Sequence, residues 1–127
     1  MLKFIFTKLD KKMKQIKRIS IYLKEDNLKA VLWKKKIKRW ILKNKKDVEI
    51  IEINESNELK NPEAIIILGG DGTIIEAIGK FSNINPIFMG LNLGNIGFMA
   101  SVRDEKNFLR GMDSLLSGNF RIDERVK

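Results

Sequence analysis

The chain has 127 residues, 43% of them hydrophobic and 32% charged, which is the size and composition of one globular domain. It contains no cysteine and no histidine, which excludes disulfides, thiolate or histidine-ligated zinc sites and a Ser-His-Asp triad. No apolar run reaches the ~18 residues of a membrane span, and the first apolar stretch is too short for a secretory signal. We therefore expect a cytoplasmic protein.

The net charge of +9 is unevenly distributed along the chain. Residues 1–46 hold 17 Lys and Arg against 3 Asp and Glu, whereas residues 47–127 hold 8 against 13. A basic block can bind nucleic acid or a membrane surface. The lysines lack interleaved aromatic residues on their own face and no nucleic-acid motif is present, so a solvated helix surface is the interpretation we favour. We expect neither nucleic acid nor a membrane among the partners.

The first half of the chain contains two predicted strands and one helix. Residues 1–16 show little pattern and are expected to form a loose or partly helical lead-in. Residues 19–23 alternate and are rich in β-branched side chains, which indicates the first strand, and residues 48–53 indicate the second. Between them, Asp26 or Asn27 can cap a helix that runs to about Asn44. Its apolar stripe at helical spacing indicates core rather than an aromatic ligand platform; it comprises Ala30, Trp33, Ile37, Trp40 and Ile41.

The second half continues the alternation after a polar loop at 54–63. The continuous apolar run at 64–68 indicates a strand buried on both faces of a parallel sheet. A short helix at 73–81 and a strand at 86–89 follow. Ser101 with Asp104 fits the capping box of a last helix, which Gly118 can terminate. This order predicts an α/β fold, a Rossmann-like parallel sheet flanked by helices, in a domain of residues 17–120.

The most informative segment is Gly69-Gly70-Asp71-Gly72-Thr73, which follows the buried strand and opens a helix. Ligands of open α/β sheets bind beyond the carboxyl ends of the strands. Glycines there let backbone N–H groups approach a ligand closely, and a helix N-terminus favours phosphate. As a tetrapeptide, Gly-Gly-Asp-Gly could equally be an ordinary strand-to-helix turn.

A second glycine-rich loop shifts this balance towards a nucleotide site. Residues 90–99 read Gly-Leu-Asn-Leu-Gly-Asn-Ile-Gly-Phe-Met and follow the next predicted strand. Adjacent parallel strands place both loops at the same sheet edge, around Asp71. Neither the dinucleotide fingerprint Gly-x-Gly-x-x-Gly nor the P-loop motif is present.

The two loops together resemble the paired signature of NAD kinases. The first motif alone is shared with diacylglycerol and sphingosine kinases and, in part, with phosphofructokinases; the second loop is more specific. The resemblance extends over roughly residues 17–127. It departs at Asn95-Ile96, where the family usually has Arg-Leu, and at Met99, where it usually has Leu. The family's second, β-rich domain with its Asn-Glu motif is not in this chain, and residues 121–127 resemble that domain's start.

The resemblance implies transfer of a phosphoryl group from ATP, or from polyphosphate, to the 2′-hydroxyl of NAD, with Mg²⁺ or another divalent cation on the phosphates. Asp71 is then the catalytic residue, which either accepts the hydroxyl proton or orients the hydroxyl. The implied nucleotide contacts are Gly69, Gly70, Asp71, Gly72, Thr73 and Asn92, with no dedicated protein metal site. It also implies a homo-oligomer for the full-length protein and little activity for these 127 residues alone. A lipid kinase of the diacylglycerol or sphingosine type and a non-catalytic nucleotide-binding fragment are the alternatives.

Overall fold

The computed structural model describes residues 2–5, 15–52, 61–94, 100–120 and 122–125. Its centre is a six-stranded sheet with the order β3-β2-β4-β5-β1-β6. The first five strands in this order run parallel, and β6 is antiparallel to β1. The strands are β1 (Leu2–Ile5), β2 (Arg18–Leu23), β3 (Glu49–Ile50), β4 (Ala64–Gly69), β5 (Ile87–Asn92) and β6 (Ile122–Arg125).

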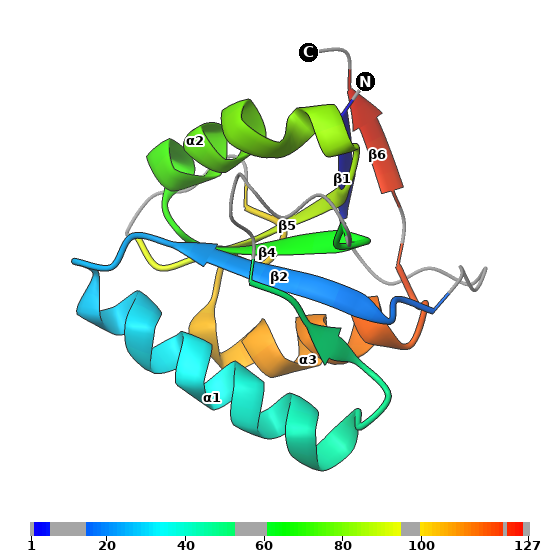
Figure 1. Ribbon diagram of the computed structural model, residues 1–127. Helices are drawn as coiled ribbons and strands as arrows, with labels where there is room; N and C mark the ends of the chain where they lie inside the picture. The colour runs from blue at the N-terminus through cyan, green and yellow to red at the C-terminus, as the bar shows by residue number, and fades with distance from the viewer. Residues whose placement is uncertain (1, 6–14, 53–60, 95–99, 121, 126–127) are drawn as a thin grey trace.

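Helices cover both faces of this sheet. α1 (Leu28–Asn44) and α3 (Phe108–Leu116) pack on one face, and α2 (Asp71–Phe81) lies on the other (Figure 1). Short 3₁₀ turns follow α2 at Ser82–Ile84 and precede α3 at Glu105–Asn107. The predicted α/β fold, a parallel sheet flanked by helices, is confirmed. In the part of the chain that the structure describes, no helix is long and apolar enough to cross a membrane.

The N-terminal segment differs from the prediction. Leu2–Ile5 form a strand between β5 and β6 rather than a loose or helical lead-in, whereas residues 6–14 lie outside the described part. Four residues are too few to show the alternation of polar and apolar side chains that indicates a strand. The pairing is also not local, because Lys3 pairs with the distant Ile87 of β5. β3 is likewise shorter than predicted, because only Glu49–Ile50 pair with β2 and residue 53 is not described.

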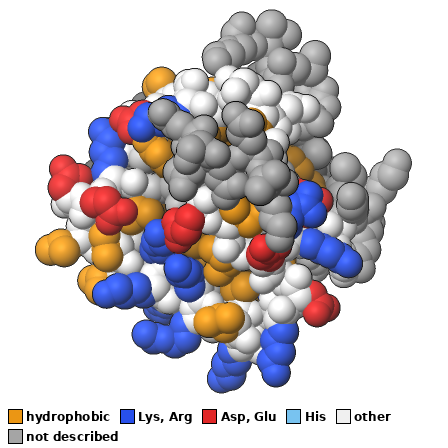
Figure 2. Space-filling model, in the orientation of Figure 1, with side chains coloured by type: hydrophobic (Ala, Val, Ile, Leu, Met, Phe, Trp, Pro, Cys, Tyr) orange, Lys and Arg blue, Asp and Glu red, His pale blue; other side chains and the backbone are white. Residues whose placement is uncertain are grey.

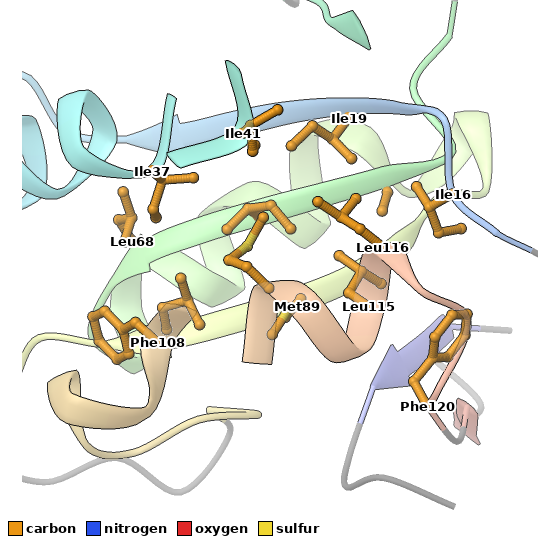
Figure 3. Packing of buried hydrophobic residues seen from close by; sticks show 14 of the residues in the cluster. Ile16, Ile19, Ile37, Ile41, Leu68, Met89, Phe108, Leu115, Leu116 and Phe120 are labelled. Atoms are coloured by element: carbon orange, nitrogen blue, oxygen red, sulfur yellow. The ribbon is translucent and has the colours of Figure 1, made fainter. Parts of the chain in front are cut away.

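The core has two parts, one on each face of the sheet. Every residue of β4 is buried, as the apolar run predicts. The larger part lies between the sheet and the helices α1 and α3 (Figure 3). Full burial of one Ile, Leu, Met or Phe side chain contributes ~1.5–3 kcal/mol to the stability of the fold. It includes Ile19, Ile37, Ile41, Leu68, Met89, Phe108, Leu115 and Phe120. The smaller part lies under α2 and comprises Ile65, Ile67, Ile74, Ala77, Ile78, Phe88 and Ala100.

The first helix begins and packs as predicted. Asn27 is its N-cap, and its side-chain oxygen accepts a hydrogen bond from the backbone N–H of Ala30 at 3.1 Å. Of the apolar stripe, Ala30, Ile37 and Ile41 are buried, and the two tryptophans pack partly buried against them. Basic side chains gather over the lower part of the molecule, where α1 lies (Figure 2).

The last helix ends as predicted but starts differently. The proposed capping box is wrong, because the hydroxyl of Ser101 instead accepts a hydrogen bond from the backbone N–H of Gly90 at 3.3 Å, and the helix begins at Phe108. At its end Gly118 has φ 80°, and the backbone N–H of Asn119 donates to the carbonyl of Ser114 at 2.8 Å. This left-handed glycine termination is a Schellman motif.

Candidate functional site

The two glycine-containing segments lie side by side at the carboxyl edge of the sheet. Gly69, the last residue of β4, is in register with Asn92, the last residue of β5. Directly after β5, the backbone N–H of Leu93 donates to the carbonyl of Gly69 at 3.1 Å. The structure therefore brings Asn92 next to the Gly-Gly-Asp-Gly segment. Residues 95–99, the rest of the second loop, lie outside the described part of the chain.

The three glycines of the first segment have different surroundings. A Cβ atom on Gly69 would lie 2.7 Å from the hydroxyl oxygen of Thr73, so only glycine fits where β4 meets the first turn of α2. A Cβ atom on Gly70 or Gly72 would meet nothing within 4 Å. Gly69 thus allows close packing inside the chain, whereas Gly70 and Gly72 leave the backbone open to a ligand.

Asp71 is the first residue of α2, and Gly70 is its N-cap. The predicted helix start at Thr73 is therefore two residues late. The side chain of Asp71 is half-buried. The first hydrogen bond of the helix runs from the backbone N–H of Ile74 to the carbonyl of Gly70 at 3.1 Å. Unpaired N–H groups of a first helical turn attract anionic groups, both carboxylates and phosphates. A carboxylate and backbone N–H groups of a first helical turn thus lie together in the same turn.

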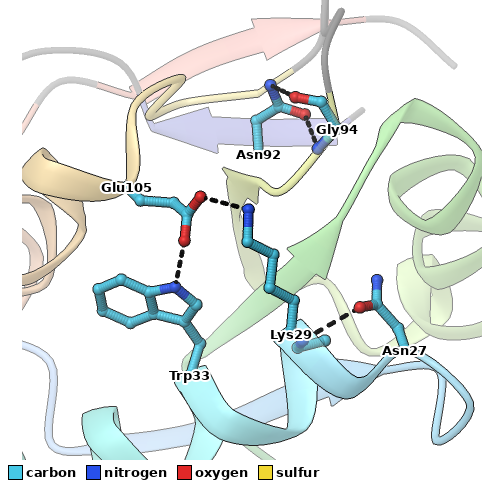
Figure 4. A network of polar contacts seen from close by, with 7 residues as sticks. Asn27, Lys29, Trp33, Asn92, Gly94 and Glu105 are labelled. Atoms are coloured by element: carbon cyan, nitrogen blue, oxygen red, sulfur yellow. Dashed lines mark hydrogen bonds and ion pairs between the residues drawn. The ribbon is translucent and has the colours of Figure 1, made fainter.

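Asn92 is buried, and its side chain organises the second loop. Its amide NH₂ donates to the carbonyl of Gly94 at 3.0 Å, and its amide oxygen accepts from the backbone N–H of Gly94 at 3.1 Å (Figure 4). Both ends of the amide therefore bond within the chain and fix the backbone at Gly94. Among the described residues Gly94 is its partner at both ends, and an Asn amide has a second N–H and a second lone pair beyond these two bonds.

Gly90 has a role that the sequence did not reveal. It was predicted to open the second loop, but it lies inside β5, which extends to Asn92. A Cβ atom on Gly90 would lie 2.7 Å from Cδ1 of Ile74 on α2 and 3.4 Å from Cα of Ala100. The glycine lets α2 pack against β5, and so helps to place Asp71, three residues before Ile74.

A polar cluster, also absent from the sequence prediction, joins β2 to α2. The hydroxyl of Tyr22 donates to Oε1 of Glu76, and the ammonium groups of Lys24 and Lys80 lie 3.4 Å and 3.8 Å from the same carboxylate. The hydrogen bond from Tyr22 holds the pKa of Glu76 below its usual range, and the two lysines act in the same direction. Burial, with the hydrogen bond to Glu76, raises the pKa of Tyr22, which keeps that hydroxyl a donor.

A second cluster fixes the chain where it returns from the second loop. The ammonium of Lys29 donates to Oε2 of Glu105, and the indole N–H of Trp33 donates to Oε1, each at 2.7 Å (Figure 4). Lys29 is the main cause that lowers the pKa of Glu105, and Trp33 adds to it. Because these partners are 72 and 76 residues from Glu105 in the sequence, no local pattern indicates the contact.

Comparison with known proteins agrees with this geometry. Residues 10–120 match the ATP-NAD kinase N-terminal domain. The chain belongs to the NAD kinase family. The NAD kinase of Clostridium tetani is 36% identical over 96 residues, which is 72% of this chain and 35% of that protein. The NAD kinase of Natranaerobius thermophilus is 42% identical over 64 residues, 50% of this chain and 22% of that protein.

A third NAD kinase, from Fusobacterium nucleatum, is 26% identical over 108 residues, 85% of this chain and 39% of that protein. The chain thus spans well under half the length of the NAD kinases that it matches. The family resemblance that the two glycine motifs indicate is confirmed.

Proposed function

We propose that this chain forms the glycine-loop part of an NAD kinase, which transfers a phosphoryl group from ATP, or from polyphosphate, to the 2′-hydroxyl of NAD's adenosine ribose. The observation that carries the proposal is the pairing of Gly69 with Asn92, which joins both family motifs at one sheet edge beside Asp71. Membership of the NAD kinase family supports the same reaction. No observation favours a lipid substrate.

Each described site residue has a role that its surroundings support. Asp71 accepts the proton of the attacking 2′-hydroxyl or orients that hydroxyl. The open backbone at Gly70 and Gly72 approaches nucleotide oxygens, because a Cβ atom at either position would meet only open space. Thr73 packs on Gly69 and shapes the turn, and Asn92 holds the second loop beside it. Phosphoryl transfer depends mainly on such positioning and on charge neutralisation.

The residues at the site are compatible with a divalent cation whose ligands come mainly from the phosphates of the substrate. Mg²⁺ in kinases is commonly bound by one or two carboxylates together with substrate phosphates. Asp71 is one carboxylate at the glycine turn, and among the described residues no three Asp, Glu, His or Cys side chains gather as a metal site. When bound, the ion would neutralise phosphate charge.

The test is an assay of the full-length gene product with NAD, ATP and Mg²⁺. Formation of NADP supports the proposal, and replacement of ATP by polyphosphate identifies the donor. Diacylglycerol and sphingosine serve as competing acceptors in parallel reactions. Phosphorylation of a lipid with no NADP formed, or nucleotide binding without any transfer, would contradict the assignment.

A further inference from the structure

Lys24 is the first residue beyond β2, and it lies at the same sheet edge as the glycine turn. Leu23 is in register with Leu68, so Lys24 lies level with Gly69 on the neighbouring strand. Its carbonyl accepts a hydrogen bond from the backbone N–H of Asn27 at 3.0 Å, which closes the turn into α1. The backbone of Lys24 is therefore fixed beside the Gly-Gly-Asp-Gly segment.

Its side chain extends towards the first turns of α2. The ammonium lies 3.4 Å from Oε2 of Glu76. Glu76 is three residues beyond Thr73 on α2, and three residues of helix rise ~4.5 Å. Thr73 in turn packs on Gly69. The ammonium is thus paired with a residue about one helical turn beyond Thr73, while 51% of the Lys24 side chain is exposed.

The side chains that meet at Glu76 carry more positive than negative charge. Two ammonium groups, those of Lys24 and Lys80, share one carboxylate, and Tyr22 contributes a neutral hydroxyl. Because the Tyr22 hydroxyl also donates to this carboxylate, the carboxylate keeps a partner when the Lys24 ammonium turns to another anion. Lys29 also has a contact near this edge, but it is less free to bind another anion. Its ammonium donates to Glu105 at 2.7 Å, and among the described ion pairs Glu105 has no second cation that could replace it.

We propose that the Lys24 ammonium binds a phosphate group of the nucleotide at the glycine turn, with Glu76 and Tyr22 as positioning residues. The ligand chemistry is a phosphate oxygen, either of the phosphoryl donor or of the NAD pyrophosphate. The inference rests on the proposed function and adds a cationic side chain to a site whose described part otherwise offers backbone N–H groups, the carboxylate of Asp71 and the neutral side chains of Thr73 and Asn92. A charge-assisted hydrogen bond of this kind corresponds to roughly tenfold or more in affinity.

The experiment measures binding of ATP and of NAD to the full-length gene product by calorimetry, for the wild type and for Lys24→Met, Lys24→Arg and Lys80→Met. Lys80 is the matched control, because it also faces Glu76 but lies one turn further from the glycine turn. We expect Lys24→Met to weaken one nucleotide roughly tenfold and to flatten its salt dependence, with Lys24→Arg close to wild type. Lys80→Met should change affinity less than about twofold. A loss for ATP identifies the donor phosphates, and a loss for NAD identifies its pyrophosphate.

Unchanged affinity for both nucleotides in Lys24→Met overturns the inference, as does an equal loss in Lys80→Met or a wild type that binds neither nucleotide. Melting temperatures of all variants show that the fold is intact. NADP formation is followed separately. A protein whose nucleotide binding depends on Lys24 but which makes no NADP would disprove the proposed reaction and leave the phosphate contact standing.

Discussion

Gly69 and Thr73 are packed so closely that a methyl group on Gly69 would lie 2.7 Å from the Thr73 hydroxyl oxygen and 2.8 Å from its Cβ atom. This contact joins the end of the buried central strand to the first turn of the helix that carries Asp71. The glycine motif therefore has a packing role in addition to the ligand-binding role that we propose for it. Its glycines should respond differently to the same substitution.

Gly69→Ala should destabilise the fold, because neither the strand end nor the helix turn can move away without disturbing the core. Overpacking of this kind costs ~1–3 kcal/mol in the free energy of unfolding. Gly79→Ala is the matched control, since Gly79 lies on the exposed side of the same helix and a Cβ atom there meets nothing within 4 Å. That variant should gain ~0.5–1 kcal/mol from helix propensity. Urea denaturation of both variants checks the prediction. Equal changes in the free energy of unfolding would show that Thr73 moves aside at little cost.

Asp71→Asn should remove most of the turnover while leaving the fold intact. The side chain is half-buried at the start of α2, and loss of a positioned acid–base or orienting group lowers kcat by roughly 10²-fold or more. Asp113→Asn is the control: Asp113 is exposed on α3 and pairs with Lys45 at 3.0 Å, a surface contact that contributes little. The measurement is NADP formation by the full-length product under saturating substrates. Near-normal kcat in Asp71→Asn would rule out the assigned role.

Glu105→Gln should change how stability depends on pH. Lys29 and Trp33 lower the pKa of Glu105 in the folded state from its ordinary value of 4.5. The contribution of the Glu105 carboxylate to the free energy of unfolding is therefore fully present when the pH is above that ordinary pKa. It is lost as the pH falls through the lower pKa of the folded state. Glu105→Gln should remove this part of the acid-side loss, so its stability curve should be flatter than that of the wild type between pH 5 and pH 3, both taken as approximate limits.

The control for this prediction is Glu25→Gln, an exposed carboxyl in the turn before α1. Its curve should follow the wild-type curve, because both proteins keep the Glu105 contacts. Thermal or urea unfolding at several pH values is the measurement. Parallel curves for wild type and Glu105→Gln would mean that the cluster adds no pH-dependent stability.

Much of the fold follows from local signals in the sequence. The buried strand at 64–68, the Asn27 cap and the Gly118 termination were each predictable, because the responsible residues lie within a few positions of one another. β1 was not predictable, since four residues carry no strong pattern and its partners, β5 and β6, are distant in the sequence. The same reason explains the failed capping box: the hydroxyl of Ser101 bonds to a strand eleven residues earlier.

The candidate site divides in the same way. The meeting of Gly69 and Asn92 could be predicted, because parallel neighbours end at one edge of a sheet. The role of Gly90 and the contact between Lys24 and Glu76 could not, since both depend on how α2 sits on the sheet. Helix placement of this kind is set by side-chain packing between elements, which a one-dimensional pattern does not record.

A polypeptide of residues 1–127 alone should form little or no NADP. The three NAD kinases compared above are matched over only 22 to 39% of their lengths, and the family resemblance implies a second domain across the nucleotide. The described part of the site is an open edge, because Gly72 is exposed and a Cβ atom on Gly70 or Gly72 would meet nothing within 4 Å. Phosphoryl transfer needs water excluded from the reacting group.

The test compares this polypeptide with a full-length NAD kinase of the same family at equal concentration, with ATP, Mg²⁺ and NAD supplied to both. Circular dichroism first establishes that the shorter polypeptide is folded, so that inactivity cannot be attributed to unfolding. Calorimetry with ATP then separates a site that binds but does not react from one that does not form. If the 127-residue polypeptide turned over near the enzyme median of ~10 s⁻¹, the glycine-loop edge would be sufficient by itself, and the requirement for a second domain would be wrong.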